Sequence, residues 1–284
     1  MTRPQPPHIP EHLQKLARVQ DYGKSVDFGK TSDDYARFRP GPPASMYDRL
    51  ERIAPFRGSD LADAACGPGW VALEAAARGA RSVGFDLSPQ QVEAAQKVAA
   101  QRLAPDAAAR CSFIVARAES TTLPDASLDW YVASQAWHWF DHAAAAGEAL
   151  RVLRPGGRIV VCSFDYLPGR SPAAKASEDL VLKYNPSWPM AGGTGCHLAP
   201  LSHLPAAGFV EIEQFSYEHP QPFSHEAWRG RMRTCNGVAA SLSPDLVRAY
   251  DADLAQVLAR DFPEGPEGTI TIWHRVWVVM ARKP

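Results

Sequence analysis

The ten residues Leu61–Trp70, LADAACGPGW, constrain the fold of this chain more than any other stretch. Their first half is short and mostly apolar, as is typical of a strand buried on both faces, and it carries Asp63 near its end. Gly67 and Gly69 allow a sharp turn and let a ligand approach the backbone closely. Helix-forming residues follow over Val71–Ala77. The stretch therefore predicts a strand, a glycine loop and a helix, whose amides would face a ligand at the carboxyl edge of a sheet.

The glycine loop alone does not select a cofactor. From Gly67 to Ala72 the sequence GPGWVA also matches the G-x-G-x-x-G/A fingerprint of dinucleotide-binding domains. A nicotinamide dinucleotide therefore stays open as a ligand at this point, and the choice depends on the motifs that follow in the chain.

An acidic residue also ends the next predicted strand. Asp86 follows Arg81–Phe85, about twenty residues beyond the glycine loop, where a carboxylate accepts hydrogen bonds from both hydroxyls of a ribose. The alternative role of Asp86 is to cap the next helix. Ser88 and Pro89 already supply that helix start, as N-cap and first helical residue, so Asp86 is the strongest predicted cofactor ligand.

Two further motifs occur downstream. Leu128–Val132 resembles an F-D-x-V entry into a fourth strand, and Leu153–Gly157 reads LRPGG before a fifth strand over Arg158–Phe164. With the glycine loop and Asp86, these motifs resemble class I S-adenosylmethionine-dependent methyltransferases of the small-molecule type. Ala65 stands where the first glycine of that family's motif is commonest. A dinucleotide-binding domain has no need of the Pro-Gly-Gly turn, so the order of the motifs favours the methyltransferase family.

The resemblance implies a fold and a cofactor. The expected fold is α/β, a Rossmann-like doubly wound sheet of seven strands whose last strand is antiparallel, with an N-terminal lid and a helical cap. S-adenosyl-L-methionine would be the cofactor and S-adenosyl-L-homocysteine the product. Asp86 would hold the ribose, Leu87 and Ala118 would border the adenine, and Glu119 would supply the carboxylate that Arg117 displaces from the usual position. The residues expected at the cofactor are Asp63, Ala65, Gly67, Gly69, Asp86, Leu87, Ala118, Glu119 and Ser134.

The chain is expected to form one structural domain with four segments. These are an arm and lid over residues 1–45, a cofactor-binding core over 46–166, an insertion over the sheet edge at 167–208, and strands with a helical cap at 209–284. A short helix is expected in the arm, over Glu11–Val19. Tyr35 and Arg39 resemble the Y-x-x-x-R-P lid of many small-molecule methyltransferases, which covers cofactor and substrate. The alternative is that the lid's aromatic residues only fix the arm to the core.

An aromatic run, AWHWF, follows the fourth predicted strand, where the reactive methyl group would project. It resembles a signature of a branch that includes trans-aconitate methyltransferase-like enzymes. Trp137 and Trp139 are expected to shape the substrate pocket. His138 is either a general base or a structural histidine, and both interpretations stay open. No metal site is expected at His138, Asp141 and His142, because Asp141 is better placed to cap the next helix.

A basic stretch, WRGRMR, begins at Trp228 in the predicted cap. Arg229, Arg231 and Arg233 either clamp an acidic substrate through forked hydrogen bonds or form a solvated face above Trp228. The first interpretation adds Trp228, Arg229 and Arg233 to the predicted substrate site.

Composition limits the partners of the chain. Its 284 residues, 45% of them hydrophobic, suffice for one substantial core. A net charge of -1 gives no reason to expect nucleic acid or an anionic membrane, and no apolar run is long enough to span a bilayer. Five widely spaced cysteines without a C-x-x-C pair favour free thiols. We expect a cytoplasmic monomer or homodimer that acts on a small molecule, with no nucleic-acid or membrane partner.

These inferences together predict methyl transfer to a small-molecule acceptor, with O- or N-methylation favoured, by in-line displacement. Two other functions stay open: an NAD-dependent oxidoreductase, and a protein that binds S-adenosylmethionine without methylating. Transfer to an RNA base is disfavoured by the near-zero net charge and the lack of a recognisable RNA-binding motif.

Overall fold

A seven-stranded sheet forms the centre of the molecule, of which a computed structural model describes residues 18–21, 24–27 and 37–284. The strand order is β5-β4-β3-β6-β7-β9-β8. Strands β5 to β7 are parallel neighbours, whereas β9 is antiparallel to both β7 and β8. The predicted doubly wound sheet with an antiparallel last strand is confirmed. The strands are β3 (Asp60–Ala64), β4 (Arg81–Asp86), β5 (Cys111–Val115), β6 (Leu128–Ser134), β7 (Leu153–Tyr166), β8 (Val210–Phe223) and β9 (Ile270–Arg282).

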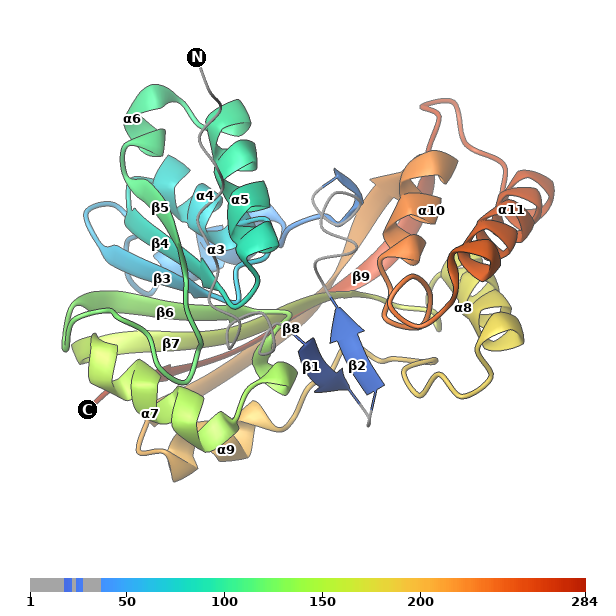
Figure 1. Cartoon of the computed structure of the whole chain (residues 1–284). Helices are drawn as coiled ribbons and strands as arrows, with labels where there is room; N and C mark the ends of the chain where they lie inside the picture. The colour runs from blue at the N-terminus through green and yellow to red at the C-terminus, as the bar shows by residue number, and fades with distance from the viewer. Residues whose placement is uncertain (1–17, 22–23, 28–36) are drawn as a thin grey trace, which may run out of the picture.

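Helices cover both faces of this sheet (Figure 1). The alternation of side chains along β6 explains why, because Trp130 and Val132 enter the core on one face while Tyr131 and Ala133 enter it on the other. No helix in the described ranges is both long and apolar enough to cross a membrane. The first face carries α3 (Ala44–Glu51) and α4 (Trp70–Ala77), beside which lie α5 (Pro89–Arg102) and α6 (Pro105–Ala108); the second carries α7 (His142–Val152) and α9 (Pro200–Ala206).

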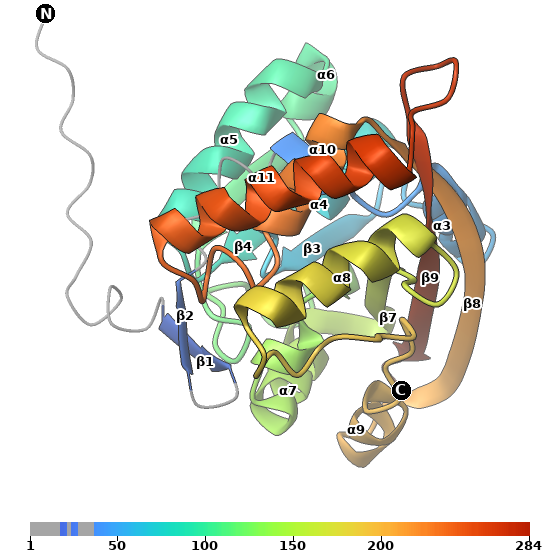
Figure 2. The same cartoon turned by 90° about the vertical axis from the view of Figure 1, so that its right-hand side faces the viewer.

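A helical cap stands at one end of the two long antiparallel strands (Figures 1 and 2). It consists of α8 (Pro172–Tyr184), α10 (His225–Arg233) and α11 (Pro244–Asp261), which share a hydrophobic cluster around Trp228 and Tyr250. Strands β8 and β9 contain 14 and 13 residues, whereas the central β3 contains five. The long strands therefore extend past the parallel part of the sheet and carry the cap beyond its carboxyl edge.

Two of the predicted helix starts are confirmed, and one predicted helix is corrected. Ser88 caps α5 by accepting from the amide of Gln91, and Asp141 caps α7 by accepting from the amide of Ala144 at 3.1 Å. The helix predicted to end at Val19 is wrong at that end: β1 (Arg18–Asp21) pairs antiparallel with β2 (Lys24–Asp27). Valine favours strands, and here it pairs with another valine, whereas the rest of the predicted helix lies outside the described residues.

The loop after β3 turns through three residues with positive φ. Gly67 and Gly69 have φ of 51° and 84°, which glycine adopts without steric cost. Ala65 also has φ of 51°, in the left-handed region that costs a residue with a Cβ about 1–2 kcal/mol. The position at which the family's motif most often has glycine is therefore one where this chain holds alanine under backbone strain.

We predict that Ala65→Gly raises the free energy of unfolding by up to about 1 kcal/mol, because relief of the strained φ outweighs the greater freedom of glycine in the unfolded chain. Ala76→Gly, in the last turn of α4 and at ordinary helical geometry, is the control and should lower the same quantity by about 1 kcal/mol or more. Urea unfolding measures both. Equal losses in the two variants would contradict the strain at Ala65.

Candidate active site

A cavity of about 730 Å³ lies at the carboxyl edge of the parallel strands. The chain passes from β3 outward through β4 and β5, and then returns to β6 on the other side of β3. The loops after β3 and β6 therefore diverge, which opens a crevice at this edge. The cap supplies the opposite wall. The residues that line the cavity from the ends of the parallel strands include Ala65, Gly67, Asp86, Leu87, Ser88, Ala118, Glu119, Ser134, Gln135, His138, Trp139 and Asp165.

Asp86 is fixed in the wall of this cavity by two backbone amides. Gly67 donates to its Oδ2 at 3.0 Å and Ser88 donates to its Oδ1 at 2.9 Å. Burial raises the pKa of Asp86, and hydrogen bonds from the backbone amides of Ser88, Gly67 and Leu87 oppose that effect. Because a carboxylate has about four acceptor positions, these amides leave acceptor capacity for a ligand. Asp86 is thus oriented by the glycine loop and still able to accept from hydroxyl groups.

Asp63 and Gly69 support the loop from behind. Asp63 is 2% exposed, and its Oδ2 accepts from the amide of Ala72 in the first turn of α4. Burial raises the pKa of Asp63 to about 7. A Cβ on Gly69 would lie 2.7 Å from the ring of Phe113, so this glycine permits close packing. Neither residue lines the main cavity, although Asp63 borders a small side cavity of about 50 Å³ next to the loop.

The other predicted cofactor residues lie together around the main cavity. Leu87, Ala118 and Ser134 line it at the ends of β4, β5 and β6. Glu119 also lines it, and this carboxylate accepts from the amide of Asp141 at 3.1 Å and pairs with Arg117 at 3.4 Å. Glu119 is thus held at the cavity by its neighbours on both sides.

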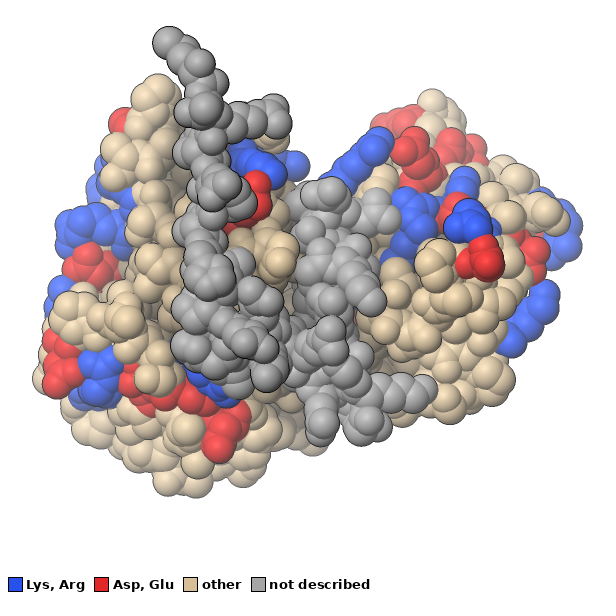
Figure 3. Space-filling view, in the orientation of Figure 1, with Lys and Arg blue, Asp and Glu red and all other residues tan. Residues whose placement is uncertain are grey.

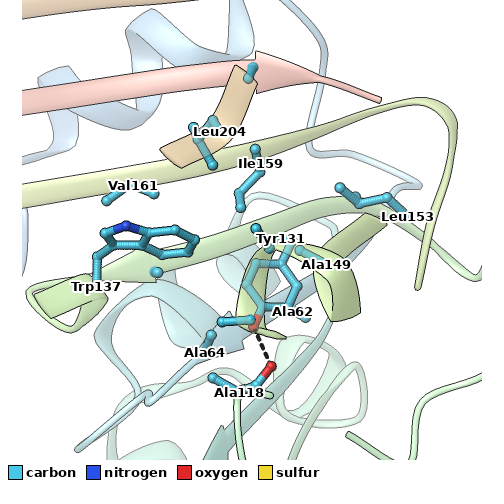
Figure 4. Close-up of a cluster of buried hydrophobic side chains, with 14 of the residues drawn as sticks. Ala62, Ala64, Ala118, Tyr131, Trp137, Ala149, Leu153, Ile159, Val161 and Leu204 are labelled. Atoms are coloured by element: carbon cyan, nitrogen blue, oxygen red, sulfur yellow. Dashed lines mark hydrogen bonds between the residues drawn. The ribbon is translucent and has the colours of Figure 1, made fainter. Parts of the chain in front are cut away.

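The aromatic run divides between the cavity and the core. Trp137, His138 and Trp139 form one turn of 3₁₀-helix, in which successive side chains point about 120° apart. His138 and Trp139 line the cavity, whereas Trp137 is 4% exposed and lies in the cluster shown in Figure 4, with Ile159 and Val161. Trp137, predicted to contact substrate, therefore belongs to the hydrophobic core.

His138 faces the cavity as a neutral imidazole. Removal from bulk water, with help from His197 and Arg39, lowers the pKa of His138 to about 4. The side chain remains accessible from the cavity and its ring lies 4.5 Å from that of Trp139. At neutral pH His138 is therefore able to accept a proton but has low basicity.

A carboxylate and a second histidine meet on the same wall. Asp165, at the end of β7, accepts from or shares a proton with His197 at 2.7 Å between Oδ2 and Nε2. Burial opposes ionisation of Asp165, but the hydrogen bond and charge of His197 outweigh it and bring the pKa of Asp165 to about 2. The same hydrogen bond raises the pKa of His197. The pair is thus an ionised carboxylate beside a histidine biased toward its protonated form.

The lid residues divide between described and undescribed parts of the chain. Tyr35 lies outside the described residues. Arg39 lines the cavity, and its Nε donates to the hydroxyl of Thr234, just after α10, at 3.0 Å. Phe38 lies against Gly230 of α10, where a Cβ would come within 2.3 Å of the phenyl ring. The lid end therefore docks on the cap.

The predicted substrate residues of the cap lie away from the cavity. Trp228 is fully buried and donates to the hydroxyl of Ser177 at 2.9 Å, so it is a core residue of the cap. Arg229 and Arg233 both pair with Asp251 of α11. The predicted clamp is therefore corrected at these two positions, because both side chains already pair with an internal acid and neither lines the cavity. Arg231, between them, is the arginine of this stretch that lines the cavity.

Sequence reasoning missed two residues of the site, for different reasons. Asp165 directly follows the predicted strand Arg158–Phe164, so the rule that selected Asp86, an acid at a strand's carboxyl end, could have selected it too. His197 lies in a loop that carries no periodic pattern or motif, and only the folded chain brings it to Asp165.

Comparison with known proteins identifies the domain. Residues 62–161 match the model of a family described as the methyltransferase domain. This part of the chain is therefore similar to a methyltransferase domain. S-adenosylmethionine is the methyl donor of this family.

On the described surface in Figure 3, Lys and Arg alternate with Asp and Glu, without a uniformly basic region on that face.

Similar proteins extend this match to different degrees. An uncharacterized methyltransferase of Mycobacterium tuberculosis (strain ATCC 25618 / H37Rv) is 34% identical over 135 residues, 48% of this chain and 51% of the relative. The 27-O-demethylrifamycin SV methyltransferase of Amycolatopsis mediterranei is 33% identical over 178 residues, 61% and 63% of the two chains. The chain thus spans about half to less than two thirds of the length of these curated relatives.

Solved structures show the same fold over most of the chain. A structure from Anaeromyxobacter dehalogenans, assigned as a type II methyltransferase, is 25% identical with a TM-score of 0.61, covering 87% of this chain and 98% of the other. A Haemonchus contortus N-methyltransferase that holds phosphomonomethylethanolamine and S-adenosylhomocysteine is 19% identical, with a TM-score of 0.52 and coverage of 91% and 60%. The second likeness concerns the fold alone.

Replacing Asp165 by Asn should lower the pKa of His197, because the imidazolium loses the opposite charge that favours it. We expect the pKa of His197 to fall from above its ordinary value of about 6.5 to that value or below. NMR titration of the imidazole signals measures it. His203, which stacks on His142 instead, is the internal control and should not change. An unchanged pKa of His197 would contradict the pairing.

Proposed function

We propose that this protein transfers the methyl group of S-adenosyl-L-methionine to a small-molecule acceptor, at oxygen or nitrogen. The observation that carries the proposal is the orientation of Asp86, which backbone amides fix at the wall of the cavity while acceptor capacity stays available. This is the acceptor that a ribose diol requires at the end of a second strand.

The residues around the cavity fit the cofactor from one end to the other. Asp86 would hold the ribose hydroxyls, and Leu87 and Ala118 would border the adenine. Ala65 and Gly67 would lie beside the methionine part, since both line the cavity in a turn that exposes backbone. Asp63 and Gly69 would act through the loop, by holding its conformation.

The cofactor supplies an activated sulfonium methyl group, which a nucleophile accepts by in-line displacement. The protein's main contribution is then to position the acceptor, and near-attack alignment supplies on the order of 7 to 11 kcal/mol. Trp139 and the cap exclude water from the cavity wall. A carboxylate nucleophile needs no base, whereas a hydroxyl group must lose its proton.

His138 is the base that fits such an acceptor best. It is neutral at physiological pH, whereas the hydrogen bond to Asp165 biases His197 toward its protonated form. A base with so low a pKa does not deprotonate a hydroxyl group in advance. It suits an acceptor that loses its proton to His138 while the methyl group is being transferred. Two curated relatives favour oxygen as the acceptor atom: the rifamycin methyltransferase acts on a 27-O-demethyl compound, and a Dechloromonas aromatica relative, 36% identical over 135 residues, is a malonyl-[acyl-carrier protein] O-methyltransferase.

Isothermal titration calorimetry tests the cofactor. We expect S-adenosylmethionine and S-adenosylhomocysteine to bind. Asp86→Asn should lower the affinity for S-adenosylhomocysteine about 10- to 100-fold, because a hydrogen bond to a charged group is worth about 1.5–3 kcal/mol. Asp106→Asn, at an exposed position on α6, is the control and should bind normally. Binding of NAD in place of both compounds would overturn the proposal in favour of an oxidoreductase.

His138→Ala tests the base. For a hydroxyl acceptor found by methyl incorporation, we expect kcat to fall about 10²- to 10⁴-fold while the affinity for S-adenosylhomocysteine is unchanged. In the unmodified protein the rate should fall as the pH drops through about 4, where His138 takes up a proton. Turnover of the variant equal to that of the original chain at every pH would remove His138 from the catalytic residues.

A further inference from the structure

Arg231 is a buried cation on the wall of the cavity. It lies near the end of α10 and is 5% exposed. Its Nη1 donates to the sulfur of Cys235 at 3.0 Å, and its guanidinium lies over the ring of Tyr166, 4.5 Å from the centroid. Within the described part of the chain, its Nε is buried without a hydrogen-bond partner, and no acidic residue forms an ion pair with it.

Such a cation is incompletely compensated. An arginine does not lose its proton in proteins, and a buried charge is costly unless it is paired and hydrogen-bonded. A thiol and an aromatic face are weak partners compared with a carboxylate. The acid that this helix packs against, Asp251, binds Arg229 and Arg233 instead. The cap therefore pairs the two flanking arginines with its own Asp251 and leaves Arg231 toward the cavity.

The other charged side chains near Arg231 indicate what net charge a ligand at this wall would carry. Arg39 lines the same part of the cavity. Asp165 is ionised, but its hydrogen bond goes to His197, so it acts on Arg231 only through space. Glu178 is 3% exposed and is bound by the hydroxyl of Tyr166 at 2.9 Å, and burial raises its pKa. Asp165 thus offsets part of the positive charge that Arg231 brings to this wall, which suits a monoanion better than a phosphate dianion.

We propose that Arg231 binds a carboxylate group of the methyl acceptor, so that the acceptor is a carboxylic acid; this rests on the methyltransferase function proposed above. Arg231 lines the cavity with its Nε still without a hydrogen-bond partner, and the fork geometry of a guanidinium matches a carboxylate. The ring of Tyr166, 4.5 Å from the guanidinium, limits where that group can lie.

The cofactor's own methionine carboxylate is the other source of the same chemistry, because Arg231 also borders the small side cavity beside Gly67. The contacts that hold Arg231 favour the acceptor. Cys235 and Tyr166 both line the main cavity and do not line the side cavity. The guanidinium is therefore held from the cap, on the side where an acceptor enters.

Acetate and acetamide, which have nearly the same shape, test this with the full chain. Calorimetry and thermal unfolding are measured with each compound, with and without saturating S-adenosylhomocysteine. We expect acetate to bind and to stabilise the S-adenosylhomocysteine complex, and acetamide to have no comparable effect. Arg231→Leu should weaken acetate about tenfold or more, and Arg231→Lys, which keeps the charge but loses the fork, should weaken it less. Arg248→Leu, exposed on α11, should bind acetate normally.

Several outcomes would overturn the proposal. Equal effects of acetate and acetamide, or equal acetate affinity in the Arg231 variants, would show that Arg231 binds no carboxylate. Arg231 would belong to the cofactor site if saturation with S-adenosylhomocysteine abolished acetate binding and Arg231→Leu lowered the affinity for S-adenosylhomocysteine. Inorganic phosphate that binds more tightly than acetate through Arg231 would replace the carboxylate. If the leucine variant does not fold, Arg231→Lys gives the comparison.

Failure of the methyltransferase function itself gives a different result. In that case S-adenosylhomocysteine does not bind the unmodified chain at all, and the acetate titrations without it still report whether Arg231 holds an anion.

Discussion

The position of β3 between β4 and β6 is the constraint on which the rest of the site depends. All the parallel strands end at one edge, and the chain leaves β3 in one direction and returns on its other side. The loops at that point cannot cover each other, so the crevice is a consequence of strand order. The left-handed turn at Ala65, Gly67 and Gly69 then brings the amide of Gly67 to Asp86 and fixes the next strand's carboxylate.

The antiparallel β9 determines the second half of the cavity. Since β8 and β9 pair along most of their length, they remain regular beyond the parallel strands and carry α10 and α11 past the sheet edge. Trp228 stabilises this extension, packing against Phe223 at the end of β8 and donating to Ser177 on α8. The residue predicted to contact substrate instead holds the cap in place over the site.

Local signals in the sequence predicted the parts that depend on local chemistry. Asp86 was identifiable because strand, acid and helix start follow one another in the chain. Trp137 and Trp228 were not separable from pocket residues, because an aromatic side chain suits a core and a binding site equally well. The same limit applies to Arg229 and Arg233, since their partner Asp251 lies on the next helix of the chain and only packing brings it near.

The two buried acids of the cavity, Asp86 and Asp165, are stabilised by different partners. The two ends of the cavity therefore favour different ligand groups. Asp86 accepts hydrogen bonds from backbone amides, which are neutral and held by the loop. Its carboxylate therefore keeps its negative charge and still favours donors such as hydroxyl groups. Asp165 forms a hydrogen bond with His197, and the positive charge of that histidine offsets the negative charge of Asp165. With Arg231 beside it, the cap end therefore carries spare positive charge. A ligand with hydroxyl groups at one end and an anionic ligand at the other would each enter where the wall complements it.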